Sequence, residues 1–432
     1  MILHPSFDVN GAGHLTVCGR DAVELAKEYG TPAIFIDEDA VRSACRTYKS
    51  ALARYFGGGS SPVYAGKALC VKKMYEILRE EDMMADCVSP GEIATAEAAG
   101  FDLGRVFFHG NNKSDDDIRY AVSRGVGRFV TDGVDELLAL DRIAGEYGVK
   151  QKILLRIAPG IDPHTHKKII TGSIDSKFGS AIETGQAEAV VRLAMTLPNV
   201  ELDGLHCHVG SQIFDTEPFT DAADIMLRFI AHIKNTCGYE GTVLNLGGGF
   251  GVRYTEDDPE ISYEDNVRLV ADAIDRTCRE LGIDRPTIFM EPGRSLVAAA
   301  GVTLYTAGSV KEIPGFRNYV SVDGGMTDNP RYTLYQSRYT VINASRASSP
   351  ADFETTVAGR CCESGDLLAE NVKIARPSRG DVIAVLVTGA YNYSMASNYN
   401  RVPRPPVLFI SKDGIKTAVR RETYDDMLAL DE

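Results

Sequence analysis

Short apolar runs recur from Pro62 to Arg294 at intervals of roughly 30 residues, the length of a β-strand–helix–β-strand unit. Each run ends in polar residues or glycine. Helical spacing of apolar positions follows, as at 71–81, 134–148 and 263–281. The runs are VYAGKA from 63, MMADCVS from 83, RVFFHGN from 105, RFVTDG from 128, ILLRIAPG from 153, LDGLHCHVG from 202, VLNLGGGFG from 243 and TIFMEPGR from 287. These eight regular units favour a TIM-type (β/α)8 barrel, with a doubly wound sheet as the alternative.

The pattern changes near residue 300, where β-rich segments separated by turn residues replace the helical periodicity. They are VTLYTAGSVKEI, NYVSVDGGM, YTVINAS, FETTVAG, DVIAVLVTGAY and VLFISKDGIKTAVRR. This texture predicts a second, antiparallel β domain, to which the N-terminal segment 15–37 can donate a strand and a helix. We therefore expect an α/β chain with an N-terminal segment over 1–35 that joins the β domain, a barrel over 36–299 and the β domain over 300–432.

The composition is that of a folded globular protein, because 44% of the 432 residues are hydrophobic and 25% are charged. The net charge of −14 argues against nucleic-acid binding, which needs a basic surface to neutralise phosphates. No apolar stretch approaches the ~20 residues that span a bilayer, and the first residues lack the apolar core of a secretion signal. Nine cysteines without CxxC spacing indicate reduced thiols, most of them in the core. We expect a cytoplasmic protein with no nucleic-acid or membrane partner.

Candidate functional residues fall where the predicted barrel strands end, the place where βα barrels gather their functional groups. They are Lys67, Asp86, His109, Asn111, His206, His208, Gly247, Gly248, Gly249, Glu291 and Arg294. The glycine loop suits close approach of main-chain N–H groups to a phosphate, helped by a following helix N-terminus, although such loops also close tight turns. Arg294 in EPGR can hold a phosphate or carboxylate through paired donors, or form an ion pair at the rim.

Lys67 is the candidate nucleophile. Its neighbours in the run are apolar, so the lysine can lie partly desolvated and ready to form an imine; a surface lysine is the alternative. His208 suits a ligand, an acid or base, or a stacking group. A metal site is disfavoured, because the pair formed by His206 and His208 lacks a third ligand at a recognisable spacing.

The predicted β domain adds two segments with chemical character. In RCCESGDLL, Cys362 lies beside Glu363 and a Ser-Gly turn, which indicates an exposed loop where a thiol can exchange a proton. A buried structural thiol fits Cys361 better. The segment GAYNYSMASNYN, which contains Tyr391, is either a plain loop or the lining of a site.

Taken in order, these motifs identify the chain as similar to the diaminopimelate decarboxylase family, within the alanine-racemase-like fold III group of pyridoxal-phosphate enzymes. The resemblance covers nearly the whole length. It rests on YAGKA, FHGNNKS, HTHKKIITGSIDSKFG, HCHVGSQ, GGGFG, EPGR, RYTLY, CESGD and GAYNYSMASNYN. It implies a barrel that binds pyridoxal 5′-phosphate, a β domain built from both termini, and a homodimer in which the CESGD loop reaches the partner's site. The implied reaction is decarboxylation of meso-2,6-diaminopimelate to L-lysine and CO2, the last step of lysine biosynthesis.

The resemblance also implies residue roles. Lys67 would link covalently to the cofactor, His208 would stack on its ring, and Glu291 would pair with its ring nitrogen. Cys362 would donate a proton to the carbanion. The remaining cofactor-binding residues implied are Asp86, Ser211, Gly247, Gly248, Gly249, Gly293, Arg294 and Tyr391. The implied substrate-binding residues are Arg294, Arg331, Tyr335, Glu363 and Tyr391, and no metal is expected.

Substrate chemistry agrees with this assignment. The far end of meso-diaminopimelate carries a carboxylate, which Arg294 and Arg331 can bind, and an ammonium group, which Glu363 can bind. Ornithine and arginine lack that carboxylate and would leave buried donors unsatisfied. Three positions depart from the family pattern: Tyr332 replaces a proline, YQSRY replaces a histidine-containing segment, and Gly66 replaces a bulkier residue.

Three alternatives remain. A decarboxylase of ornithine, arginine or a related amine would want an acidic group near Arg331. A cofactor-binding regulatory paralogue would have lost catalytic groups, whereas Lys67 and Cys362 are both present. A racemase would carry a tyrosine base in place of the CESGD cysteine.

Overall fold

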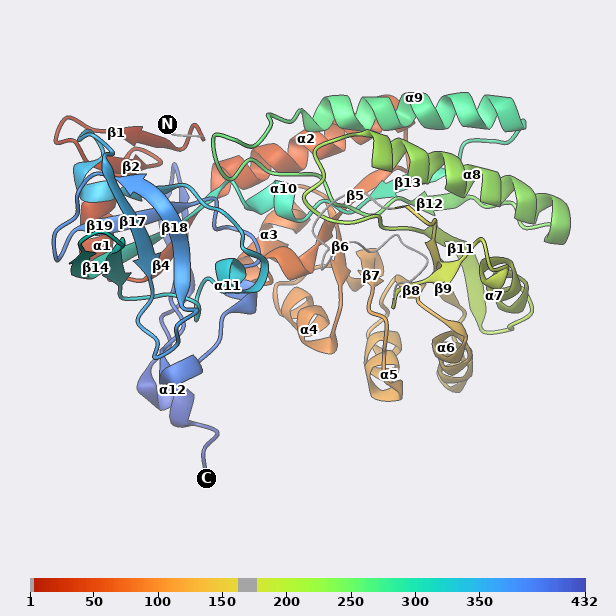
Figure 1. Ribbon diagram of the computed structural model, residues 1–432. Helices are drawn as coiled ribbons and strands as arrows, with labels where there is room; N and C mark the ends of the chain where they lie inside the picture. Colours follow the sequence, from red (N-terminus) through yellow and green to blue (C-terminus); the bar gives the residue numbers. More distant parts are fainter. Residues whose placement is uncertain (1–3, 162–176) are drawn as a thin grey trace. The chain divides into compact units, whose positions relative to one another are not determined.

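The computed structural model describes residues 4–161 and 177–432, which form two compact units (Figure 1). The β unit comprises Met1–Ala44, Val252–Glu260 and Arg294–Glu432. The barrel unit comprises Cys45–Gly251 and Ile261–Gly293. Residues 164–176 of the HTHKKIITGSIDSKFG motif lie outside the described residues.

The barrel unit is built on eight parallel strands that close into a ring. They are β5 (Ser61–Ala65), β6 (Met84–Cys87), β7 (Val106–Phe108), β8 (Arg128–Thr131), β9 (Gln151–Ala158), β11 (Val200–His206), β12 (Val243–Asn245) and β13 (Thr287–Met290). Each strand pairs with the next, and pairing of β13 with β5 closes the ring. A two-residue strand, β10 (Ser180–Ala181), also pairs with β9. The predicted barrel is therefore confirmed, and the doubly wound sheet is excluded.

Side chains from six of these strands form one buried cluster: Val63, Phe107, Val130, Leu154, Val243 and Phe289. Phe107 and Phe289 make an edge-to-face contact with ring centroids 5.2 Å apart. A packed core of this kind leaves the strand ends as the place for polar groups.

Helices follow seven of the eight strands and lie outside them (Figure 1). They are α3 (Lys72–Glu80), α4 (Pro90–Ala98), α5 (Asp115–Ser123), α6 (Val134–Glu146), α7 (Gln186–Ala194), α8 (Glu217–Cys237) and α9 (Tyr263–Leu281). The eighth strand has no such helix, since only α10 (Arg294–Val297) follows it. Instead α2 (Glu38–Phe56), ahead of the first strand, stacks Tyr48 on Tyr263 of α9 with centroids 5.3 Å apart.

The β unit contains a nine-stranded sheet. Its strands are β4 (Ala33–Asp37), β14 (Gly301–Ile313), β15 (Arg317–Val322), β16 (Val341–Asn343), β17 (Phe353–Ala358), β18 (Leu367–Ile374), β19 (Val382–Leu386), β20 (Val407–Ser411) and β21 (Gly414–Val419). The main order is β18-β17-β15-β14-β4-β20-β21, and β19 pairs with β14 and β16. All pairings are antiparallel except β15–β17 and β4–β20. The N-terminal segment thus donates β4, as predicted, whereas β18 was not predicted.

The remaining elements are short. The N-terminal region forms an antiparallel sheet of β1 (Phe7–Val9), β2 (Leu15–Val17) and β3 (Arg20–Asp21), followed by α1 (Ala22–Tyr29). The other helices are α11 (Arg331–Tyr335) and α12 (Tyr424–Leu428), with 3-10 turns at Gly66–Ala68, Leu103–Arg105, Ala344–Arg346, Tyr393–Met395 and Tyr399–Arg401. Among the described residues, no helix has both the length and the apolar character that a membrane span requires.

Candidate active site

Lys67 lies directly after β5, in the 3-10 turn Gly66–Ala68. Its neighbours Ala65 and Ala68 are buried, whereas Lys67 itself is exposed. Of the two alternatives that the sequence left open, the structure shows the exposed lysine. The parallel register pairs Ala65 with Asp86, so the lysine turn lies beside the carboxylate at the end of β6.

Two carboxyl groups, the buried Asp86 and the half-buried Glu92, interact with the charge of Lys67. Burial raises the pKa of Asp86, and the charges of His109 and Lys67 oppose that rise. Burial also raises the pKa of Glu92 to about 7, and repulsion from Asp86 adds to the effect. Oδ1 of Asp86 has no hydrogen-bond partner among the described residues. A buried oxygen left in this state marks a place where a ligand group can bind.

Glu92 was missed by sequence reasoning because it looks like part of a helix cap. Ser89 caps α4 by accepting a hydrogen bond from the Glu92 N–H at 3.3 Å. The Glu92 carboxylate accepts one from the Val88 N–H at 2.6 Å. The S-x-x-E spacing is the ordinary signature of a helix start, so it gave no signal of a site.

Glu291 follows β13 and contacts side chains from three other strand ends. His109 Nε2 lies 2.8 Å from Oε1, and Asn245 Nδ2 donates to the same oxygen at 2.8 Å. His206 Nε2 lies 3.2 Å from Oε2. Although burial opposes ionisation, the two imidazoles lower the pKa of the Glu291 carboxyl well below its usual range. Glu291 is therefore a buried carboxylate that is ionised at neutral pH.

His109, His206 and Glu291 place possible ligand atoms within 4.8 Å of one another. Sequence reasoning paired His206 with His208 and found no third ligand, because the other partners come from distant strands. In the structure both ring nitrogens contact the carboxylate directly, His109 Nε2 at 2.8 Å and His206 Nε2 at 3.2 Å.

The glycine loop folds too tightly to carry side chains. A Cβ on Gly248 would lie 2.0 Å from the Glu291 carbonyl oxygen, and one on Gly247 would lie 2.6 Å from that of Cys207. Gly247 N–H donates to Asn245 Oδ1 at 2.9 Å, and Gly248 N–H donates to His208 Nδ1 at 3.2 Å. The sequence predicted a helix N-terminus directly after this loop; that prediction is wrong, because α9 begins only at Tyr263.

His208 lies just beyond β11 and is partly exposed, as is Ser211 three residues later. Burial, with the charges of Lys67 and Arg156, lowers the pKa of His208 well below its usual value. His208 is therefore a neutral ring at neutral pH, in keeping with an Nδ1 that accepts from Gly248.

Arg156 was also missed, because its run was interpreted only as a strand. It lies in β9 with its guanidinium 4.2 Å from the Phe178 ring centroid. Its Nε is 3.7 Å from Asp132 Oδ1. This cation adds positive charge to the group around Glu291 and His208.

In the β unit, two buried arginines share one tyrosine ring. The guanidinium carbon of Arg294 lies 4.7 Å from the Tyr391 centroid, and that of Arg331 lies 5.4 Å from it. Arg331 also lies 5.1 Å from the Tyr335 ring, and Arg294 donates to the Tyr254 hydroxyl at 2.7 Å. No ion pair joins Arg331 to a carboxylate among the described residues. The four residues predicted for this region therefore lie together, and Tyr254 joins them.

Cys362 and Glu363 lie in the exposed turn between β17 and β18, as predicted. Cys362 N–H donates to Asn400 Oδ1 at 2.8 Å. Cys361 is half-buried, not core, and burial raises the pKa of its thiol to about 11. All nine cysteines are free thiols, and Cys45, Cys87, Cys207 and Cys278 are the buried ones, so fewer than half lie in the core.

Tyr332, which departs from the family pattern, contacts the sheet of the β unit. Its hydroxyl donates to Glu370 of β18, which also pairs with Arg317 at 2.6 Å. Tyr332 therefore anchors α11 to the sheet, and Arg331 and Tyr335 keep their contact with each other.

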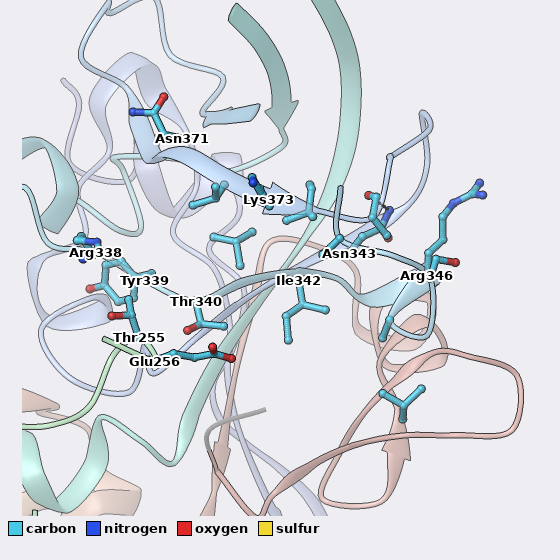
Figure 2. A pocket seen from close by; sticks show the side chains of 18 of the residues that line it. Thr255, Glu256, Arg338, Tyr339, Thr340, Ile342, Asn343, Arg346, Asn371 and Lys373 are labelled. Atoms are coloured by element: carbon cyan, nitrogen blue, oxygen red, sulfur yellow. Dashed lines mark hydrogen bonds between the residues drawn. The ribbon is translucent and has the colours of Figure 1, made fainter. Parts of the chain in front are cut away.

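A pocket of about 420 Å³ in the β unit lies apart from the predicted residues (Figure 2). Segments 255–257, 338–343 and 371–375 line it, with Arg338 and Arg346 at opposite ends. None of the predicted site residues lines this pocket. Tyr339 in its wall packs edge-on against Tyr254 with centroids 5.3 Å apart.

Comparison with known proteins places this geometry in a family. Residues 38–298 match the family described as pyridoxal-dependent decarboxylase, pyridoxal binding domain. Diaminopimelate decarboxylase of Bacillus subtilis (strain 168) is 43% identical over 431 residues, covering 100% of this chain and 98% of the relative. That of Staphylococcus aureus (strain COL) is 41% identical and covers 98% of both chains.

A solved structure gives the same result. Diaminopimelate decarboxylase from M. jannaschii in complex with L-lysine is 32% identical, with a TM-score of 0.91. The match covers 100% of this chain and 99% of that one. The chain therefore belongs to the diaminopimelate decarboxylase family of pyridoxal-dependent decarboxylases.

Proposed function

We propose that this protein decarboxylates meso-2,6-diaminopimelate to L-lysine and CO2 with pyridoxal 5′-phosphate as cofactor. The observation that carries the proposal is the pair of buried arginines around Tyr391, with Arg331 lacking a carboxylate partner among the described residues. This arrangement suits a substrate that brings a carboxylate of its own. The relatives named above support the same reaction.

The barrel unit offers groups that fit pyridoxal phosphate. Lys67 at the strand end would hold the cofactor covalently through Nζ, and the ionised Glu291 suits a protonated ring nitrogen. The orphaned Asp86 oxygen provides a further polar contact. Gly247 and Gly248 already donate their N–H groups within the protein, so Gly249 is the motif glycine that we assign to the phosphate. His208, Ser211, Gly293, Arg294 and Tyr391 complete the predicted set.

When bound, the cofactor supplies an electron sink for the pair left on the α-carbon as CO2 departs. Glu291 keeps a proton at the ring nitrogen, which increases that capacity. His208 is neutral and lies beside the glycine loop, so it can stack on the ring without adding positive charge. Cys362 then gives its thiol proton to the α-carbon.

Specificity follows from the far end of the substrate. Arg294 and Arg331, with Tyr335 and Tyr391, take the distal carboxylate, and Glu363 takes the distal ammonium group. Ornithine and arginine bring no distal carboxylate to the buried Arg331, and leaving a buried charge without that pairing is costly. No acidic side chain forms an ion pair with Arg331 among the described residues. The acidic group that ornithine or arginine would require near Arg331 is therefore missing there.

We also propose a homodimer. Cys362 and Glu363 are exposed in a turn of the β unit, so they are available to a second copy of the chain. A dimer that lends this turn to its partner would share the active site across the interface. The cytoplasmic location, the domain bounds 1–35, 36–299 and 300–432, and the absence of a resident metal stay predictions.

A substrate panel tests the function. Purified protein with pyridoxal phosphate is offered meso-diaminopimelate, its L,L isomer, ornithine and arginine, and CO2 and product amine are measured. We expect lysine from the meso isomer alone. Release of CO2 from ornithine or arginine instead would overturn the roles given to Arg331 and Glu363.

A further inference from the structure

We propose that His109 and His206 are positioning residues that fix the Glu291 carboxylate for the cofactor's ring nitrogen. The inference rests on the proposed function, since it concerns the same cofactor. It assigns a role to His109 and His206, two residues at strand ends for which the family resemblance implies none.

The geometry shows a carboxylate held from several directions. His109 follows β7, His206 ends β11, Asn245 ends β12, and Glu291 follows β13. Oε1 accepts a 2.8 Å hydrogen bond from Asn245 and lies 2.8 Å from His109 Nε2, an ion-pair contact without hydrogen-bond geometry. Oε2 has only His206 Nε2, at 3.2 Å. A carboxylate oxygen accepts about two hydrogen bonds, so Oε2 keeps one position for a further donor.

The two rings also restrain each other. They meet edge to face with centroids 5.0 Å apart, and the main-chain N–H of His109 donates to the Cys87 carbonyl at 2.8 Å, which anchors the backbone that carries this ring. Both residues and Glu291 are less than one-tenth exposed. A carboxylate confined in this way cannot rotate to another partner, and one oxygen stays directed at its ligand.

His206 acts as a neutral donor. Burial lowers its pKa to about 4, and Glu291 opposes that shift without cancelling it. Its Nε2 therefore carries the proton toward Glu291, and Nδ1 carries none. This agrees with Nδ1 having no hydrogen-bond partner among the described residues, because an unprotonated nitrogen is less costly to leave bare than an N–H.

A neutral donor matters for the cofactor. A fully charged imidazolium would compete with the ring nitrogen for the carboxylate charge, whereas a neutral N–H orients the carboxylate and leaves most of its charge available. The expected consequence is a ring nitrogen that stays protonated at pH values where the free cofactor would lose its proton.

The test follows the ring nitrogen directly. The protein is loaded with pyridoxal phosphate labelled with 15N in the ring, and the 15N shift is followed with pH by NMR in the absence of substrate. His206→Leu removes the donor at similar volume, and His206→Gln restores an amide N–H near the Nε2 position. The matched control is His232→Gln, a surface histidine whose Nε2 lies 2.7 Å from Glu188.

We expect His206→Leu to lower the titration midpoint of the ring nitrogen by about one pH unit or more, the effect of losing one hydrogen bond to a buried carboxylate. Turnover should fall about tenfold with little change in KM. His206→Gln should restore most of the titration midpoint and most of the turnover. In the Glu291→Gln background, His206→Leu should have no further effect on the midpoint.

An unchanged midpoint in His206→Leu, equal to that of the His232→Gln control, would overturn the inference. So would an equal effect of His206→Leu with and without Glu291. Failure of the proposed function is distinct, because then the unmodified protein would neither take up the labelled cofactor nor release CO2 from meso-diaminopimelate.

Discussion

The carboxylate of Asp366 accepts a 2.7 Å hydrogen bond from the main-chain N–H of Cys361. The other carboxylate oxygen accepts one from the Met326 N–H at 2.6 Å. The main-chain carbonyl of Asp366 accepts one from the Gly359 N–H at 2.8 Å. Asp366 is buried, and its hydrogen bonds fix the turn between β17 and β18 that carries Cys362. The backbone that presents Cys362 is therefore held by a side chain four residues later.

Asp366→Asn should loosen this turn. The amide group would turn an N–H toward a backbone donor, which costs about 1–3 kcal/mol at a buried site. We expect turnover of meso-diaminopimelate to fall about tenfold to 100-fold, since displacement of a reacting group by about 1 Å has effects of this size. Asp352→Asn, at an exposed position, serves as the control. Unchanged turnover in a stable Asp366→Asn protein would show that the turn is held by other contacts.

Lys67→Ala should abolish both the visible absorbance of bound pyridoxal phosphate and the release of CO2, because no other group would replace the covalent link. The measurement is an absorbance spectrum after gel filtration of the loaded protein. Lys72→Ala, an exposed lysine at the start of α3, should keep the spectrum. A visible band and full activity in Lys67→Ala would contradict the assignment.

Cys362→Ala should separate cofactor binding from turnover. The variant keeps Lys67 and Glu291, so the cofactor spectrum should match that of the unmodified protein. Turnover should fall about 100-fold or more, the usual effect of losing a positioned proton donor. Cys237→Ala, in the barrel helix α8, provides the comparison. Equal turnover in the two variants would remove the proton-donor role.

The stability of the cofactor-free protein should fall as pH rises from about 4.5 to about 7, because of Glu92. Burial raises the pKa of Glu92 from 4.5 to about 7, so the folded state binds its proton more tightly than the unfolded state does. Ionisation in that window therefore favours unfolding, by up to about 3 kcal/mol when complete. Urea unfolding at pH 5, 6, 7 and 8 measures this slope.

Glu92→Gln removes the titrating group and keeps an acceptor for the Val88 N–H. The variant should be more stable than the unmodified protein at pH 8 and about equal to it at pH 4.5. Parallel pH profiles for the two proteins would show that Glu92 ionises in the folded state as it does in water. Glu97→Gln, on the exposed part of the same helix, controls for the change in net charge.

The barrel could be predicted because its strands are short, apolar and regularly spaced, and each of the eight runs contains one strand. The strand β18 was not predicted because the half-buried Glu370 and the exposed Asn371 and Lys373 break its apolar run, and the paired strand β17 supplies the burial. The missing eighth helix could not be foreseen either, since α2, which precedes the first strand, packs beside α9.

The site shows the same division. Lys67, Asp86, Glu291 and the glycine loop could be placed at strand ends because barrel geometry dictates it. The contacts of Glu291 with His109, His206 and Asn245 join four strands that are far apart in sequence. The exposure of Lys67 could not be decided from the sequence, because local apolar neighbours do not determine how far a lysine side chain is covered.

The place of β4 within its sheet has a consequence for synthesis of the protein. Its neighbours β14 and β20 both lie beyond the barrel in the chain, so β4 leaves the ribosome about 260 residues before its first partner. At ~5–20 residues per second that interval exceeds ~10 s, long enough for the whole barrel to emerge. The barrel sequence is thus an insertion that can fold during translation, while the sheet that begins the chain is completed last. A ribosome-stalled chain that exposes its residues up to about 300 outside the exit tunnel should accordingly carry a folded barrel and an N-terminal strand still open to proteolysis or chaperones.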